Sequence, residues 1–300
     1  MRRLFCFALI LCCCPFVDAV SPPVTKARPA PPSLEIAALQ LALDNAGFSP
    51  GIIDGRDGAK TTIAVQWARD AEQAVEMPDK PWREWKIPEH FLEEVAQVPK
   101  SWLERSQTTG MWHETNLERI SETFHVSRAF LVFLNPGIRD WTAVQEGDSL
   151  HVPAIDPRKL PRADHVRIFL SRKIIVAYGD DEKILAAFPC SIAAKKEKRP
   201  IGVLQVCNFA PHPDYVFDPT LFEDPEARTL KSKLIIPPGP NNPVGDMWIG
   251  LNLKGYGIHG TPNPEDIGKT ESHGCFRLTN WDVVRLANML KIGTPVSVEP

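Results

Sequence analysis

The pattern of apolar and polar positions changes near residue 160. After it, short apolar runs rich in β-branched residues predict strands. These runs cover residues 166–170, 174–178, 184–192, 201–209, 248–251, 256–259 and 294–298. Before the last of them, apolar residues from Val283 to Leu290 recur at helical spacing behind a capping pair, Thr279 and Asp282. The second half is therefore predicted to be mainly β, a sandwich or barrel-like sheet that carries few helices.

The first half of the chain contains shorter patterns of helical period. In residues 33–76, Ser33 is placed to cap a helix, and turn signals separate this helix from a second one. In residues 101–155, Thr115 and Glu118 form a capping box at the start of two short helices, which a strand follows. The first half is thus predicted to hold two small modules, one α-helical and one α+β.

Proline-rich stretches separate these units, and the chain has 29 prolines in total. The stretches lie at residues 20–32, 77–100 and 156–161. Segments of this kind are extended and semi-rigid. We expect a tether at 20–32 and a partly packed linker at 77–100. The chain is therefore predicted to be multidomain, with its C-terminal domain at 164–300.

The first residues, 1–19, have the pattern of an export signal. Two arginines precede an apolar run, and Val17-Asp18-Ala19 fits a small-residue cleavage site. The run is shorter than the roughly 20 residues that a bilayer span needs. We expect cleavage after Ala19 and an exported protein in the periplasm or cell wall. An uncleaved signal that tethers the chain to the membrane is the alternative.

Composition excludes one class of partner and bears on the cysteines. The formal net charge is −3, so no basic excess argues for nucleic acid. Loss of residues 1–19 leaves Cys190, Cys207 and Cys275, and an odd number in an exported chain leaves at least one thiol unpaired. Cys190 and Cys207 lie in apolar, strand-like runs. A disulfide between them and two buried free thiols are both open.

A cysteine with two nearby histidines is the main chemical feature of the chain. Cys275 follows His273 by two residues and His259 by sixteen, a spacing that a returning loop can close. The thiolate is the reactive form, and a free cysteine has a pKa of about 8.5, so a nearby base such as histidine is needed to activate the thiol near neutral pH. Gly274 lets the backbone bend and present amide groups to an oxyanion. Arg277 offers either a carboxylate clamp for substrate or an internal salt bridge.

Other kinds of site use the same residue types. Zinc usually takes four ligands in short pairs such as C-x-x-C, and this segment contains no such pair. A buried cysteine beside structural histidines is the other alternative. The residues favour a nucleophilic cysteine, and we expect neither a metal nor a cofactor.

The segment around Cys275 resembles the signature of L,D-transpeptidases of the YkuD type. The match consists of His259-Gly260-Thr261 and Ser272-His273-Gly274-Cys275-Phe276-Arg277-Leu278. The resemblance implies that Cys275 is the nucleophile, that His259 takes its proton and that the Gly260 carbonyl orients His259. It implies that His273 lines the site and helps to position substrate or the oxyanion, and that the amides of Gly274 and Cys275 contribute the oxyanion hole. It also implies a substrate-binding set: Ser272, Arg277 and Thr261.

Both modules of the first half resemble wall-binding domains. Residues 33–76 are similar to the peptidoglycan-binding-like helical domain through Leu39-Gln40, Gly47-Phe48, Pro50-Gly51, Asp54-Gly55, Lys60-Thr61 and Ala64-Val65. Residues 101–155 resemble a LysM domain, a βααβ module, through Leu134-Asn135-Pro136 and Gly147-Asp148-Ser149-Leu150. Each module is alternatively a spacer that binds nothing.

These resemblances imply an exported cysteine transpeptidase of the bacterial cell wall. It would take an acyl group from a peptidoglycan stem tetrapeptide through a thioester and pass it to an amine, which forms a cross-link or attaches a wall protein. Carbapenems are the expected covalent inhibitors, and the loop at 210–219 is a candidate lid. Two alternatives are open: an L,D-carboxypeptidase or endopeptidase that hydrolyses the same bonds, and a non-catalytic peptidoglycan-binding protein.

Overall fold

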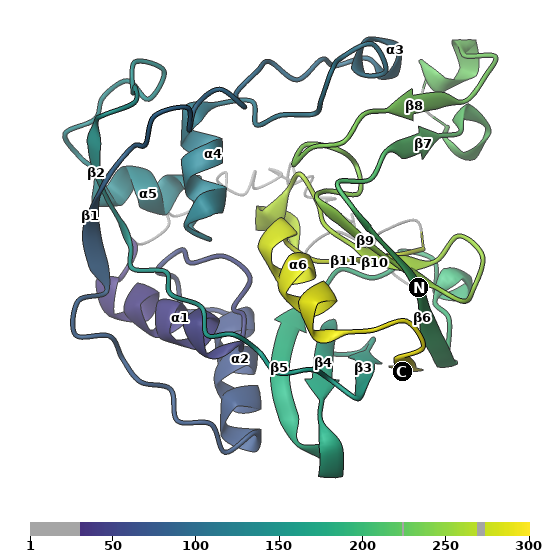
Figure 1. The fold of residues 1–300 in the computed structure, drawn as a ribbon, viewed down its shortest axis with the longest axis horizontal. Coiled ribbons are helices and arrows are strands. Elements are labelled where there is room, and N and C mark those ends of the chain that lie inside the picture. Colours follow the sequence, from purple (N-terminus) through teal and green to yellow (C-terminus); the bar gives the residue numbers. More distant parts are fainter. Residues whose placement is uncertain (1–30, 224, 269–273) are drawn as a thin grey trace, which may run out of the picture. The chain divides into compact units, whose positions relative to one another are not determined.

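The computed structural model describes residues 31–223, 225–268 and 274–300 (Figure 1). The predicted export signal at 1–19 and most of the proline-rich segment at 20–32 lie outside the described residues. Residues 32–300 form one compact unit. Within the described ranges, no helix is both long enough and apolar enough to cross a membrane.

An eight-stranded sheet is the framework of the second half. In spatial order its strands are β11 (Phe276–Arg277), β10 (Gly257–His259), β9 (Met247–Leu251), β6 (Gly202–Pro211), β12 (Pro295–Glu299), β3 (His165–Phe169), β4 (Ile174–Tyr178) and β5 (Ile184–Pro189). Neighbouring strands are antiparallel, except that β12 runs parallel to β3 and β10 runs parallel to β11. The prediction of a mainly-β second half is confirmed.

The strand β6 and the helix α6 hold this sheet together. β6 pairs with β12 through its first part and with β9 through its second part. α6 (Asn280–Met289) lies against the sheet (Figure 1), with Val283 and Leu286 fully buried in the main hydrophobic core. The Thr279 side chain caps α6 by accepting a hydrogen bond from the Asp282 N–H, as the sequence predicts.

Two short strands form a hairpin apart from the main sheet. β7 (Tyr215–Phe217) pairs antiparallel with β8 (Leu234–Ile236). The sequence predicts only a proline-rich loop here, because three-residue strands are too short to show an alternating pattern. Single 3-10 turns occupy this and other loops: η1 (Asp180–Glu182), η2 (Lys196–Lys198), η3 (Pro219–Leu221), η4 (Ala227–Thr229) and η5 (Pro264–Asp266).

Two helices from the first half, α1 (Leu34–Ala46) and α2 (Ala59–Asp70), cover the face of β4 and β5 that points away from the main core (Figure 1). Ser33 caps α1, as the sequence predicts, and Gly47 follows the helix in the left-handed conformation with φ 95°. Trp67 of α2 stacks on Phe169, the last residue of β3, with 5.6 Å between ring centroids. This helical unit therefore shares a hydrophobic cluster with the sheet.

A two-stranded sheet and three short helices make up the rest of the first half. They are β1 (Trp82–Lys86), α3 (Trp102–Arg105), α4 (Asn116–Thr123), α5 (Arg128–Leu134) and β2 (Ser149–Pro153), and β1 pairs antiparallel with β2. The expected linker at 77–100 thus contains a strand. Its prolines flank β1 without interrupting it, and the partner strand lies far along the chain, so the local pattern does not show the pairing. The domain boundaries in the first half stay predictions.

Candidate active site

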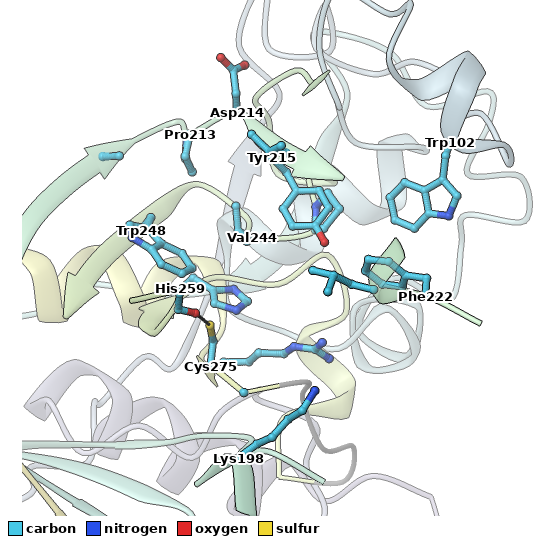
Figure 2. Close-up of a pocket in the computed structure, with 17 residues that line it drawn as sticks. Trp102, Lys198, Pro213, Asp214, Tyr215, Phe222, Val244, Trp248, His259 and Cys275 are labelled. Atoms are coloured by element: carbon cyan, nitrogen blue, oxygen red, sulfur yellow. Dashed lines mark hydrogen bonds between the residues drawn. The ribbon is translucent and has the colours of Figure 1, made fainter. Parts of the chain in front are cut away.

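A cavity of ≈ 670 Å³ lies between the sheet, the β7–β8 hairpin and α3 (Figure 2). The sheet side contributes the predicted residues Cys275, His259 and Arg277. The hairpin contributes Tyr215 among others, and α3 contributes Trp102. The predicted nucleophile and base therefore line one cavity together with aromatic side chains.

Strand pairing brings Cys275 and His259 together. β10 runs parallel to β11, with Ile258 opposite Phe276 and His259 opposite Arg277. Because side chains alternate between the two faces of a strand, Cys275 and Arg277 lie on the same face as His259. Cys275 is then the diagonal neighbour of His259, with about 8 Å between Cα atoms from ordinary strand spacings. Both side chains line the cavity drawn in Figure 2, so the chain between them returns on itself as the sequence predicts.

His259 is a neutral imidazole with a defined tautomer. Its ring is buried, with Nδ1 2.7 Å from the carbonyl oxygen of Gly260. A carbonyl only accepts, so Nδ1 carries the hydrogen and Nε2 keeps a free lone pair. Burial lowers the pKa of His259 to about 4. Trp248 stacks on the ring, with 5.6 Å between centroids and 16° between planes, and this fixes its orientation.

The Cys275 thiol is protonated at rest. Its Sγ–H donates to the carbonyl of Gly255 at 3.4 Å, the contact drawn in Figure 2. Burial raises the pKa of Cys275, and the nearby guanidinium of Arg277 opposes this shift only in part. A raised thiol pKa next to a lowered imidazole pKa disfavours a resting thiolate–imidazolium pair. Both groups are therefore neutral before substrate arrives.

The guanidinium of Arg277 is available to a ligand in the cavity. The Arg277 backbone is fixed by two hydrogen bonds with Ser191, N–H to carbonyl in each direction, at 3.0 and 2.9 Å. Its side chain lines the cavity, and Nε is buried without a hydrogen-bond partner among the described residues. Burial lowers the pKa of Arg277. A guanidinium that lines the cavity fits the carboxylate clamp, one of the two roles left open by the sequence.

The other predicted site residues fall into three groups. Gly274 lines the cavity beside Cys275. Thr261 is buried outside the cavity lining, and its N–H donates to Asn280 Oδ1 at 3.2 Å. Two of the predicted residues, Ser272 and His273, lie outside the described residues.

Sequence reasoning missed the aromatic residues of the cavity. Trp248, Tyr215, Phe222 and Trp102 all line it. Three of them lie in strands or loops of the second half, and Trp102 lies far upstream, beyond the reach of any motif spacing. The available signal was the concentration of aromatic residues in proline-rich loops, which by itself indicates packing as readily as binding.

In the part of the chain that the structure describes, the two cysteines outside the cavity are free thiols. Cys190 is fully buried and Cys207 is exposed. The alternative of a Cys190–Cys207 disulfide is therefore not what the structure shows, and only one of the two thiols is buried. Among the described residues, no group of three His, Cys, Asp or Glu side chains is arranged to hold a metal ion.

Comparison with known proteins assigns the second half of the chain to one family. A model of the L,D-transpeptidase catalytic domain (YkuD) matches residues 163–298. A Bacillus licheniformis protein named as the L,D-transpeptidase YkuD is 29% identical over 185 residues, 61% of this chain and 93% of the relative. Its Bacillus subtilis namesake is 26% identical over 183 residues, 61% of this chain and 92% of the relative.

Solved structures are also similar to the chain over part of its length. L,D-transpeptidase 3 from Mycobacterium tuberculosis, in complex with a faropenem-derived adduct, is 17% identical with a TM-score of 0.37. The match covers 52% of this chain and 76% of that one.

Proposed function

Residues 163–298 are a YkuD-type L,D-transpeptidase domain, and from this premise we propose that the protein transfers acyl groups between peptidoglycan stem peptides through a thioester on Cys275. The observation that carries the proposal is the pair of a protonated thiol and a neutral imidazole. His259 lies in β10, and Cys275 immediately precedes the adjacent parallel strand β11. The imidazole has a free Nε2 lone pair, which is what a general base requires. Both groups open into a cavity large enough for a peptide.

The first step is acylation. Nε2 of His259 takes the proton from Cys275 Sγ as sulfur attacks the carbonyl carbon of the donor peptide. The tetrahedral intermediate collapses, the C–N bond to the terminal residue breaks, and the imidazolium returns its proton to the leaving amine. The products are a Cys275 thioester and a free amino acid. Backbone amides of Gly274 and Cys275 are the proposed donors to the oxyanion, and Arg277 is the proposed partner of a substrate carboxylate.

The second step is transfer. An acceptor amine attacks the thioester carbonyl, and His259 takes a proton from the nitrogen. The C–S bond breaks, a new amide forms, and the proton returns to Cys275 Sγ. An amine on a second stem peptide gives a cross-link, and an amine on a protein attaches that protein to the wall. Water in place of the amine gives a carboxylic acid, which is the hydrolytic alternative.

Incubation of the purified protein with a disaccharide-tetrapeptide tests this proposal. We expect a cross-linked dimer by mass spectrometry in the native protein and no product in Cys275→Ala. In His259→Gln we expect acylation to slow by about 100-fold or more, the usual contribution of a general base. Tripeptide without dimer would identify a hydrolase. Equal product from the native protein and Cys275→Ala would refute cysteine catalysis.

Reaction with a carbapenem tests the nucleophile without an acceptor. The thiol adds to the strained β-lactam carbonyl, the ring C–N bond opens, and the ring nitrogen takes the proton. We therefore expect a mass increase equal to the whole drug on Cys275, found by intact-mass measurement and peptide mapping. An unmodified Cys275 after prolonged exposure would contradict the proposal.

The wall-binding role of the first half and export are parts of the same proposal. β1 pairs with β2, and between them the chain forms the single-turn helix α3 and then α4 and α5, which supports a βααβ module with α3 inserted after its first strand. The pattern at 1–19 supports delivery to the periplasm or cell wall. We expect the full chain carrying Cys275→Ala to sediment with insoluble peptidoglycan. Protein that stays in the supernatant would mean that both modules are spacers.

A further inference from the structure

The β7–β8 hairpin does not complete its own hydrophobic core. The small hydrophobic cluster under the hairpin contains Phe217, Ala227 and Ile236, together with half-buried residues of β7, β8 and the loop that joins them. Every other member comes from the first half of the chain, and these are Val98, Trp102 and Met111. We call residues 98–112 the arm. The hairpin is apart from the eight-stranded sheet, so its packing depends on the arm.

Hydrogen bonds attach the arm to the chain that follows β8. The Met111 N–H donates to the Pro238 carbonyl at 2.8 Å, and the Met111 carbonyl accepts from the Asn241 N–H at 2.8 Å. The side-chain amide of Asn241 also donates to the Trp112 carbonyl at 2.8 Å. Close contact is required here, because a Cβ on Gly239 would lie 2.4 Å from the Met111 oxygen. The arm is therefore fixed to the hairpin by paired backbone groups as well as by apolar contact.

Trp102 is the residue of the arm that lines the cavity. Its ring stacks on Phe217 with 4.1 Å between centroids and 15° between planes, and Arg105 lies over its ring at 5.0 Å. Trp102 also contacts Tyr215 and Phe222, which line the same cavity. Figure 2 shows Trp102 on the side of the cavity away from the catalytic pair. One side chain of the first half thus both supports the hairpin and forms a wall of the cavity.

The hairpin side of the cavity is largely apolar, with Val216 and Leu221 beside the aromatic rings. A thioester on Cys275 can react with an amine or with water, and either reaction breaks the same C–S bond. Which one prevails depends on how well the walls exclude water until the amine arrives. A hairpin held in place by the arm favours the amine. Residues 98–112 lie outside the segment 163–298 that matches the family. The part of the cavity wall that Trp102 forms therefore comes from outside the matched domain.

We propose that the arm is a specificity element of the catalytic site, in which Trp102 forms one wall of the substrate cavity and holds the β7–β8 hairpin against it, so that the thioester is transferred to an amine rather than hydrolysed. This inference rests on the proposed function. It adds that the first half of the chain sets the outcome of the reaction.

Trp102→Ala in the full chain tests the inference. We expect the ratio of hydrolysed to transferred product to rise by about fivefold and the KM for donor peptide to rise by a similar factor, the range that one aromatic stack supplies. Hydrogen exchange should become faster in the peptide that covers 215–223 and remain unchanged in β3 and β4. A purely structural role elsewhere would not produce this local pattern.

Trp85→Ala is the matched control. Trp85 is also a half-buried tryptophan of the first half, with two aromatic neighbours, Phe91 and Phe124, and it does not line the cavity. We expect its product ratio and KM to match the native protein. If Trp102→Ala does not fold, Trp102→Phe keeps a smaller stack, and we expect the same changes at about half the size.

The outcomes separate this inference from the proposed function. If the native protein forms no Cys275 thioester, the proposed function fails. If the native protein transfers acyl groups and a folded Trp102 variant keeps the native product ratio and KM, the inference about the arm is overturned. Equal changes in Trp85→Ala and Trp102→Ala would also overturn it, because the effect would then be general loss of packing.

Discussion

Burial moves the pKa values of the two catalytic groups in opposite directions. It lowers the pKa of His259 to about 4 and raises that of Cys275. Both groups are therefore neutral at pH 7, and the Gly260 carbonyl selects the tautomer whose Nε2 accepts a proton. A buried neutral pair avoids the free-energy cost of two desolvated charges before substrate arrives.

The pH dependence of acylation follows from the His259 pKa. We expect the second-order rate of carbapenem acylation to stay nearly constant from pH 7 to about 5 and to fall as the pH drops through about 4, because only the neutral imidazole accepts the thiol proton. A histidine with the ordinary pKa of 6.5 would lose activity near that pH. Stopped-flow rates measured where fluorescence shows a folded protein check this. A fall centred near pH 6.5 would contradict it.

The side chain of Asn280 holds the backbone next to His259 in place. Its Oδ1 accepts from the N–H groups of Thr261 at 3.2 Å and Asp246 at 3.3 Å, next to the carbonyl that orients His259. A Cβ on Gly260 would lie 2.2 Å from this oxygen, so glycine is required at that position. The Thr261 N–H thus helps to fix the backbone beside Gly260, and the contact with substrate that the family resemblance implies for Thr261 stays a prediction.

Asn280→Ala is expected to lower both stability and acylation rate. The substitution leaves buried N–H groups unpaired, at a cost of about 1–3 kcal/mol, and it releases the backbone that orients His259. Urea unfolding and carbapenem acylation measure the two effects. Asn116→Ala is the control, because it also removes a side-chain bond, to the Val144 carbonyl at 2.8 Å, but in a different part of the chain. Equal acylation rates in the two variants would refute a positioning role for Asn280.

At the scale of elements, α4 and α6 meet through a buried carboxyl group. Asn280 Nδ2 of α6 donates to Glu122 Oε2 of α4 at 3.2 Å. Burial raises the pKa of Glu122 to about 8, and other ionisable groups contribute smaller effects. The titratable and charged side chains around it are His113, Glu118, Arg128 and Asp246. Glu122 is therefore protonated in the folded protein at neutral pH.

Glu122→Gln is expected to change how stability depends on pH. The unfolded chain loses this proton near the ordinary glutamate pKa of 4.5, while the folded chain holds it up to a pH of about 8. Folding therefore binds a proton in this window, and the free energy of unfolding falls as the pH rises from 4.5 to 8. Glutamine cannot titrate, so the variant should be more stable than the native protein by about 1–3 kcal/mol at pH 8. Urea unfolding at pH 5 and pH 8 measures this. The same change in the free energy of unfolding between these two pH values in the variant and the native protein would contradict it.

The elements that the sequence predicts are those with local signals. The long strands of the second half and the capped helix α6 each carry their own pattern, and the motif around Cys275 identifies the reactive pair. β1 and the β7–β8 hairpin are short, are bounded by proline and depend on distant partners, so local patterns miss them. The same reason hides Trp102, whose place in the cavity results from packing against Phe217.

At the scale of the whole molecule, the two halves share buried surface. Asp44 of α1 lies 2.8 Å from His125 Nδ1 and 3.0 Å from Arg285 of α6. Burial alone would raise the pKa of Asp44, but the interactions with His125 and Arg285 lower it. The ring of His125 also stacks on Trp281, with 4.8 Å between centroids. The first half is therefore joined to the catalytic half by polar contacts as well as by apolar ones.

A shortened chain that begins at residue 162 is expected to be poorly soluble. It would expose the face of β4 that α1 and α2 cover, including Ile174, Val176 and Tyr178, and a large exposed apolar patch promotes aggregation. Size-exclusion chromatography with light scattering measures this against the full chain. A soluble monomer of native stability would show that the two halves are energetically independent.

The exposed sulfur of Cys207 has a practical consequence. It lies on the solvent side of β6 and has no disulfide partner, so in air two copies of the protein can become covalently joined through it. A reductant-sensitive band of twice the monomer mass on a denaturing gel is expected, and Cys207→Ser should abolish it. Such a band would report sample ageing rather than a native assembly, and counting reactive thiols to quantify intact catalyst would overestimate it unless this position is first removed.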